Sequence, residues 1–221
     1  MSRNLYSYVV RSDAGFAPNP FFGYCSLATC KPRIRNGARE GDWIVGTGSN
    51  ARDVGRGGYL VYAMRVTEVI NTPAYWTDPR FQFKKPIFKG NLVRVSASGD
   101  NIYEWRGQNS WRQLHSYHSH PDGTQNEAHT KRDTGVPRVL LSDDFVYFGG
   151  EGPRLPSNYL ENGDRNFVCI GRNHRRTEEP KIINSFEQWI RGLGVHRVCG
   201  LPLEWLTQLG YTESIKEPKS C

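Results

Sequence analysis

The segment that most constrains the fold is residues 13–49, where glycine, proline and aromatic residues lead into a short apolar strand. Two prolines and two glycines interrupt its first half, and its second half reads Gly41-Asp-Trp-Ile-Val-Gly-Thr-Gly-Ser49. Glycine allows positive φ angles and lets other groups approach the backbone closely. The segment therefore predicts a loop that forms a lid or wall over a glycine-interrupted strand, and it is the first candidate for a binding site.

Strand-like segments dominate the first two thirds of the chain, and helical spacing appears near its end. Apolar, β-branched and aromatic residues predict strands over 5–11, 42–47, 59–70 and 167–170, with weaker ones over 92–95 and 102–105. Residues 138–142 and 145–148 are expected to form two strands or one bent strand. Strands 42–47 and 59–70 are expected to form a hairpin with a long loop. Helices are expected over 72–77, 182–193 and 203–209, with long loops over 108–134 and 149–164 and a basic turn over 171–176.

This pattern predicts an α+β fold, a small curved sheet or partly open barrel with helices packed against it. The length of 221 residues suits a single domain over 1–221, with a core at about 5–175 and a C-terminal helical appendage at about 180–210.

Composition restricts the class of protein and its partners. The chain has 29 basic and 22 acidic residues, a net charge of +7, which favours nucleic acid or another polyanion, or is simply that of a basic protein. Five cysteines without a CxxC pair argue against a zinc site made of cysteines alone. No apolar stretch has the length of a signal sequence or a membrane span, so we expect a reduced, cytoplasmic protein with no membrane partner and no cofactor.

Two phosphate-binding motifs are absent although their glycine spacing is present. Gly41 and Gly46 have the spacing of a P-loop, but Thr47 stands where that loop needs lysine. Gly46, Gly48 and Ala51 imitate a dinucleotide fingerprint, but a strand follows where a helix must begin. These departures exclude nucleoside-triphosphate hydrolysis and dinucleotide binding of those types.

Three groups of side chains could carry chemistry. His118 and His120 are two residues apart, which on an extended chain would point them the same way, as a metal site requires. Cys30 precedes basic residues that would favour its thiolate, so it is a candidate nucleophile, as Asp42 is a candidate base. The alternatives are a polar surface loop for the histidines, a buried small residue for the cysteine and a capping role for the aspartate.

Basic clusters alternate with aromatic residues along the chain. Positive charge suits phosphates and aromatic faces suit bases, so this alternation is typical of proteins that bind single strands or flipped bases. The competing interpretation places the aromatic residues in the core and the charges in solvent. The arginines that would hold phosphates are Arg33, Arg35, Arg52 and Arg56.

Several of these motifs together resemble a known family. The Gly41 to Ser49 strand, the strand ending at Ile70, and Tyr75 with Asp78, Pro79 and Phe81 are similar to the EVE branch of the PUA-like superfamily. The chain resembles more closely the second of the nucleotide modification associated domain families, through residues 16–20 (Phe-Ala-Pro-Asn-Pro), 27–32 (Leu-Ala-Thr-Cys-Lys-Pro), 138–143 (Arg-Val-Leu-Leu-Ser-Asp) and 147–149 (Tyr-Phe-Gly). This resemblance covers roughly residues 5–175.

The resemblance implies a PUA/EVE-like small β-barrel or strongly curved mixed sheet with flanking helices. It also implies a place in bacterial or phage systems that make, read or restrict modified nucleotides. EVE and YTH relatives hold an extruded base beside the Gly-Asp strand. This sequence departs from EVE at residues 46–48, where Gly-Thr-Gly replaces a frequent aromatic.

We therefore expect a module that holds a modified or flipped base, or a nucleotide, with DNA favoured over RNA and with modification or restriction enzymes as partners. The expected pocket consists of Asn19, Phe21, Phe22, Cys30, Lys31, Trp43, Thr47, Gly48 and Ser49. One alternative is an enzyme of base or nucleotide modification that uses Asp42, Cys30 or the histidine loop. Another is a structural subunit that binds only protein.

Overall fold

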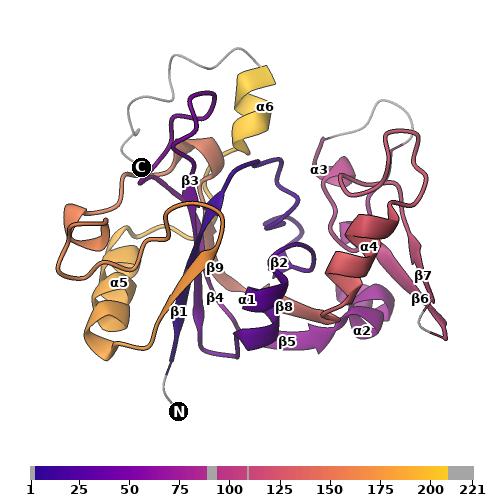
Figure 1. Cartoon of the computed structure of the whole chain (residues 1–221), viewed down its shortest axis with the longest axis horizontal. Helices are drawn as coiled ribbons and strands as arrows, with labels where there is room; N and C mark the ends of the chain where they lie inside the picture. Colours follow the sequence, from indigo (N-terminus) through magenta and orange to yellow (C-terminus); the bar gives the residue numbers. More distant parts are fainter. Residues whose placement is uncertain (1–2, 89–93, 109, 209–221) are drawn as a thin grey trace. The chain divides into compact units, whose positions relative to one another are not determined.

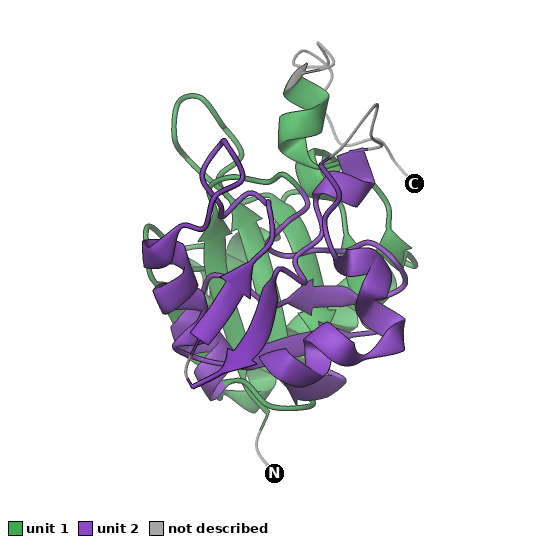
Figure 2. Cartoon of the chain, turned by 90° about the vertical axis from the view of Figure 1, so that its right-hand side faces the viewer, with its two compact units in different colours: residues 1–14, 38–66, 144–221 green, residues 15–37, 67–143 purple. Residues whose placement is uncertain are grey.

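A computed structural model describes residues 3–88, 94–108 and 110–208 of the chain. The chain folds into two compact units, each assembled from segments that are far apart in the sequence (Figure 2). Unit 1 comprises residues 1–14, 38–66 and 144–221, and unit 2 comprises residues 15–37 and 67–143.

Unit 1 contains a six-stranded mixed sheet in the order β10-β1-β3-β4-β9-β11 (Figure 1). Its strands are β1 Leu5–Val10, β3 Trp43–Gly48, β4 Leu60–Arg65, β9 Asp144–Tyr147, β10 His174–Thr177 and β11 Arg197–Val198. β1 is parallel to β3 and β9 to β11, whereas the remaining neighbours are antiparallel. Every residue of β3 is buried, which explains its continuous apolar run.

Helix α5 (Pro180–Gly192) completes the core of unit 1. Its buried residues Ile183, Phe186 and Ile190 recur at helical spacing, and the Phe186 ring packs edge-on against Trp43 of β3 at 5.5 Å. Burying each such side chain stabilises the unit by about 1.5–3 kcal/mol. The remaining helices of the unit are η2 Gly149–Glu151, η3 Ser157–Tyr159 and α6 Leu203–Gln208.

Unit 2 contains a three-stranded antiparallel sheet, β2-β8-β5, and a separate hairpin, β6-β7. The strands are β2 Cys25–Leu27, β5 Glu68–Asn71, β6 Tyr103–Gly107, β7 Ser110–Gln113 and β8 Arg138–Ser142. The helices are α1 Pro32–Gly37, α2 Thr72–Thr77, η1 Pro79–Lys84, α3 Arg94–Ala97 and α4 Glu127–Thr134. Tyr75 and Phe81 pack with Val139 and Leu141 of β8 in one of its core clusters.

A buried polar network crosses the interior of unit 2. The Nζ atom of Lys84 donates to the carbonyl and side-chain oxygens of Asn19 and to Ser26, and the Asp100 carboxylate accepts from Ser26 and Tyr75. Burial lowers the pKa of Lys84 to about 8, although Asp100 opposes that shift. The network therefore depends on both charged members.

We expect Lys84→Met to destabilise the protein by about 3–5 kcal/mol, because the change leaves the buried Asp100 carboxylate without its cation. Urea unfolding measures the difference. The neighbouring Lys85→Met is a matched control, since the Lys85 ammonium lies over the Trp76 ring in a less buried position and should cost about 1 kcal/mol or less. Equal losses in the two variants would contradict the role given to Lys84.

The α+β class is confirmed, but none of the sheets closes into a barrel among the residues that the structure describes, so the barrel prediction is not confirmed. The expected hairpin is confirmed as the antiparallel pair β3 and β4. The expected long strand over 59–70 is wrong, because the chain leaves the first sheet after Arg65. It then re-enters as β5 in the sheet of unit 2.

Smaller differences also have local causes. Residues 94 and 95 of the strand expected over 92–95 begin α3, and the other two lie outside the described residues. The loop expected over 108–134 contains β7 and α4, whose first turn is capped by the Asn126 side chain. Residues 167–170 form no strand, whereas 174–177 pair with β1 as β10. The helix at 72–77 is confirmed, and the Asn71 side chain caps its first turn.

No helix within the described ranges combines the length and the apolar character that crossing a bilayer requires.

Candidate functional site

Unit 2 brings a cysteine, a histidine and an aspartate into one hydrogen-bonded chain. The Sγ atom of Cys30 lies 3.4 Å from Nε2 of His118, and Nδ1 of the same ring lies 2.5 Å from Oδ2 of Asp133. His118 is 7% exposed and Asp133 is 1% exposed, while Cys30 is only partly buried. The thiol is thus the member of the chain that a ligand can reach.

Local backbone geometry places the thiol. Cys30 and Lys31 have positive φ angles of 57° and 39°, so the chain turns sharply between β2 and α1. Non-glycine residues in this region are uncommon and concentrate at functional sites. The backbone N–H of Cys30 donates to Oδ1 of Asp133 at 3.0 Å, which fixes the turn to the carboxylate.

The buried guanidinium of Arg35 holds the same two backbone segments together. Its Nε donates to the carbonyl of Cys30 at 2.8 Å, and its NH2 donates to the carbonyl of Asp133 at 2.7 Å. Its NH1 donates to the carbonyls of Val136 and Arg138. Arg35 is fully buried, and within unit 2 its guanidinium ties the backbone of Cys30 to that of Asp133.

Asp133 is the centre of the cluster. Besides the Cys30 amide and the His118 ring, its carboxylate accepts from Tyr103 Oη at 2.9 Å and from Arg132 Nε at 3.2 Å. Burial favours the neutral acid, but the bond to His118, its charge and that of Arg132 prevail and lower the pKa of Asp133 to about 2.

His118 is held in its charged form. Burial alone would lower its pKa, but the hydrogen bonds to Asp133 and Cys30 outweigh burial and raise the pKa of His118 to about 9. An imidazolium next to a thiol stabilises the thiolate, the nucleophilic form of cysteine. The carboxylate behind the ring fixes its orientation.

The pKa values predict a pH window for stability. His118 titrates near 6.5 when unfolded and about 9 when folded, so its contribution is complete below pH 6.5 and is lost as pH rises to 9. The pKa of Asp133 is 3.8 in the unfolded chain and about 2 in the folded protein. Its contribution to stability is therefore complete above pH 3.8 and is lost as pH falls to 2. We expect the difference in unfolding free energy between the protein and His118→Gln to be largest between these limits, at about 3 kcal/mol, and to shrink on both sides. Urea titrations from pH 3 to 10 measure it, and a pH-independent difference would contradict the assignment.

A metal ion is the alternative occupant of this cluster. The ligand atoms of Cys30, His118 and Asp133 lie within 4.8 Å of one another, and all three are types that bind zinc. However, the thiol faces one ring nitrogen and the carboxylate bonds the other. An ion bound by Sγ and Nε2 would leave Asp133 behind the ring as a supporting group. The arrangement therefore fits a nucleophile, its acid–base partner and an orienting carboxylate better than a three-ligand metal site.

Side chains around His118 enclose the imidazole. The Phe16 ring meets it edge-on at 4.8 Å, and the His129 ring does so at 4.5 Å. NH2 of Arg132 lies 3.5 Å from each of its ring nitrogens. These rings and the guanidinium account for the burial of His118.

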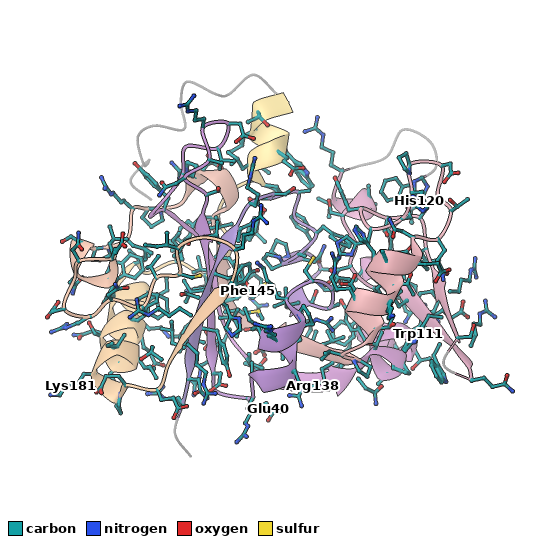
Figure 3. The ribbon with its side chains drawn as sticks, in the orientation of Figure 1. Glu40, Trp111, His120, Arg138, Phe145 and Lys181 are labelled. Carbon is teal, nitrogen blue, oxygen red and sulfur yellow. The ribbon has the colours of Figure 1, made fainter. Side chains whose placement is uncertain are left out.

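His118 and His120 do not point the same way, because they lie in a turn rather than on an extended chain. His118 is buried, whereas His120 is exposed in its loop of unit 2, where Figure 3 labels it. Within the described residues, His120 is not part of the metal-like cluster.

The other expected pocket residues of unit 2 have varied surroundings. Asn19 is buried in the Lys84 network, and Phe21 is buried. Phe22 has a φ of 62° and stacks on Phe83 at 6.2 Å. Lys31 follows the nucleophile at its turn, and Arg33 is exposed on α1.

Unit 1 contains a separate cavity of about 340 Å³ at the end of β3. Thr47, Gly48 and Ser49, three of the residues expected to form a pocket, line it together with Arg154, Glu161 and Cys169. Its volume lies at the lower end of the range of ligand pockets.

The glycines of β3 were expected to let a ligand approach the backbone, but neighbouring parts of the protein occupy that space. A Cβ at Gly46 would lie 2.4 Å from the Tyr62 ring, and one at Gly48 would lie 2.3 Å from the carbonyl oxygen of Arg56. These glycines therefore make room for the protein's own neighbouring chain. Trp43 is 1% exposed and packs in the core.

Two of the three remaining polar candidates of unit 1 are buried and bonded within the protein. Asp42 is buried and accepts hydrogen bonds from Asn4 and from the backbone N–H of Arg39. Arg56 is buried, donates to the carbonyl of Gly152 and lies over the Tyr59 ring. Arg52 is exposed.

The sequence hypotheses did not include Asp133 as the partner of His118, nor Arg35 as a support for the nucleophile. The signal available was limited to the proximity of Asp133 to the histidine-rich loop. Arg132 and the cavity residue Arg154 carried no pattern of their own.

Comparison with known proteins identifies the family of the chain. The family model described as nucleotide modification associated domain 2 matches residues 2–209. No curated protein and no solved structure matches the chain. The matched range includes every residue of the thiol–imidazole–carboxylate cluster and of the cavity in unit 1.

Proposed function

The chain belongs to the nucleotide modification associated domain 2 family, and from this premise we propose that it is an enzyme of a nucleotide-modification system with Cys30 as its covalent nucleophile. The observation that carries the proposal is the chain of contacts from the Cys30 thiol through His118 to Asp133. A nucleophile, a base within reach and a third group that orients the base are the three parts that covalent catalysis requires.

The reaction class that uses these parts most directly is acyl transfer. The Cys30 thiolate attacks a carbonyl carbon, and a C–S bond forms while the carbonyl electron pair moves to oxygen. When this intermediate collapses, the bond to the leaving amine or alkoxide breaks, and the leaving group takes a proton from His118. Water or an amine then attacks the thioester and gives its proton to His118, and the C–S bond breaks.

The supporting residues act on the nucleophile and its partner. Asp133 holds the imidazole in position and stabilises its positive charge, and its own buried carboxylate remains ionised. Arg35 fixes the backbone of Cys30 relative to that of Asp133. A thiol nucleophile needs a reducing compartment, so the proposal includes a cytoplasmic location. In the described part of the chain, Cys25, Cys30, Cys169 and Cys199 form no disulfide.

Nucleoside analysis tests the proposal. The protein and its Cys30→Ser variant are each co-expressed with the genes that flank its own, and nucleosides from DNA, RNA and the free pool are compared by mass spectrometry. We expect a modified nucleoside that is present with the unchanged protein and absent with Cys30→Ser. We also expect a mass increase on Cys30 when the covalent intermediate is trapped. Identical nucleoside profiles together with an unmodified Cys30 would refute the enzyme. If the purified protein binds zinc and both Cys30→Ser and His118→Ala lose it, the cluster is a metal site and not the site of a covalent nucleophile.

A second proposed function concerns unit 1, where the cavity at the end of β3 would hold a modified base or a nucleotide. The specific observation in its favour is that Thr47, Gly48 and Ser49 line a cavity together with the cationic Arg154. Hydrogen bonds from the strand end would read the base and Arg154 would attract phosphate. The protein would then deliver or recognise the modification for partner enzymes, with DNA favoured over RNA.

Binding of modified and unmodified oligonucleotides at two salt concentrations tests this second function. We expect affinity that depends on the base and falls with salt, and we expect Arg154→Glu to weaken it about tenfold. Arg165→Glu is the control, because Arg165 lies in the same unit outside the cavity. If no nucleotide binds and no nucleoside changes, a subunit that contacts only protein becomes the better interpretation.

A further inference from the structure

Arg132 lies beside the proposed nucleophile with part of its guanidinium unused. Its NH2 and the Sγ of Cys30 both lie within 3.5 Å of Nε2 of His118. Its Nε bonds Asp133, whereas its NH1 has no hydrogen-bond partner among the described residues. The side chain is 42% exposed, so a ligand at the thiol can reach the guanidinium.

The amide that would ordinarily help a cysteine nucleophile is already occupied. The backbone N–H of Cys30 donates to Asp133, so it does not point to an oxyanion formed at the sulfur. Charge that develops on a substrate there needs another donor. The guanidinium of Arg132 is a rigid fork of donors that suits oxygen anions.

Two cationic side chains, those of His118 and Arg132, contact the Asp133 carboxylate next to the thiol. Lys31 and Arg33 follow Cys30 directly in the sequence. Among the groups in contact with the cluster, two cations thus face one carboxylate. Such a surface attracts anions and repels cations.

Buried polar atoms near the same site also point to a ligand or ordered water. Oγ1 of Thr29 and Oγ1 of Thr130 are buried and have no partner within the described residues. Thr29 immediately precedes the nucleophile, and Thr130 lies three residues before Asp133 on the buried face of α4. Because buried polar groups normally have partners, these atoms favour a site that accepts oxygen or nitrogen atoms from outside the protein.

From these observations we propose that Arg132 is the anion-binding residue of the Cys30 site, and that the substrate carries a phosphate or carboxylate next to the carbon that the thiol attacks. The proposal deepens the enzyme function above and rests on it. Within a nucleotide-modification system, a nucleotide phosphate or the carboxylate of an acyl donor supplies such an anion. Cations and uncharged nucleosides would be poor ligands.

Two alkylating reagents that differ in charge test the proposal without a known substrate. The rates at which anionic iodoacetate and neutral iodoacetamide modify Cys30 are measured by peptide mass spectrometry, with the exposed Cys199 as internal reference. We expect Arg132→Gln to lower the iodoacetate-to-iodoacetamide rate ratio at Cys30 about fivefold, since about 1 kcal/mol of attraction is lost. Arg132→Lys should keep most of the ratio, and the ratio at Cys199 should not change.

Protection experiments separate the sources of the anion. Nucleoside 5′-monophosphates, their parent nucleosides and succinate are each added during alkylation by iodoacetamide. Protection by the monophosphates indicates phosphate, and protection by succinate indicates carboxylate. An unchanged ratio in Arg132→Gln, or equal protection by nucleosides and nucleotides, would overturn the proposal. Failure of the proposed enzyme function gives a different result: iodoacetamide then alkylates Cys30 no faster than Cys199.

Discussion

His118→Ala should lower the rate at which iodoacetamide alkylates Cys30 by about tenfold or more near pH 6. The imidazolium lies 3.4 Å from Sγ, and a neighbouring cation generally favours the thiolate, the form of a cysteine that reacts at a useful rate. His118 stays protonated up to about pH 9, because its bonds to Asp133 and Cys30 outweigh its burial and raise its pKa. The stabilising charge is therefore present throughout the neutral range in the protein and absent in the variant.

The chain offers a matched control for this experiment. His120 lies two residues further along and is exposed, so His120→Ala should leave the alkylation rate of Cys30 unchanged. Above pH 9 the protein and His118→Ala should converge, since the ring of His118 loses its proton and its charge. Equal rates in the protein and His118→Ala at pH 6 would remove the basis for an activated nucleophile.

Strands and helices could be predicted where the residue pattern of a short segment is sufficient to indicate its secondary structure. Residues 5–10, 43–48 and 138–142 each contain a short apolar run, and the apolar spacing of α5 matches a helix. The break between β4 and β5 could not be predicted, because the two strands satisfy the same local pattern and differ only in the sheet that receives them.

The role of the glycines of β3 also could not be predicted from the local sequence. They looked like a surface that a ligand could approach, but the groups that need the space are Tyr62 and Arg56 on the following segment. A sequence shows that a side chain is missing at a position. It does not show which neighbour would have met that side chain.

The candidate site could be predicted one residue at a time but not as a whole. Cys30 and His118 each had a chemical reason to be selected, yet 88 residues separate them in the chain. Asp133 is 103 residues from Cys30, and no spacing rule links residues so far apart. The buried Arg35 looked like a phosphate ligand because its charge is visible in sequence, whereas its four carbonyl partners are not.

Asp133→Asn should have the largest combined effect on stability and on the charge of His118. The carboxylate accepts from the Cys30 amide, the His118 ring, Tyr103 and Arg132. An amide has only one oxygen, and its NH2 group would face donors that it cannot satisfy. With the charge removed as well, we expect a loss of about 3–5 kcal/mol in the free energy of unfolding.

The charge of His118 should respond in a way that simple destabilisation does not produce. Without the carboxylate, burial is opposed only by the bond to Cys30, so the pKa of His118 should fall from about 9 to near or below 6.5. NMR titration of the imidazole measures this shift in the folded variant. Asp122→Asn is the control: Asp122 is exposed and accepts hydrogen bonds from Thr124 in its own turn, so the variant should keep both the stability and the His118 titration. If Asp133→Asn loses stability while His118 still titrates near 9, the carboxylate supports the fold but does not hold the proton on the imidazole, and the charge must come from elsewhere in the site.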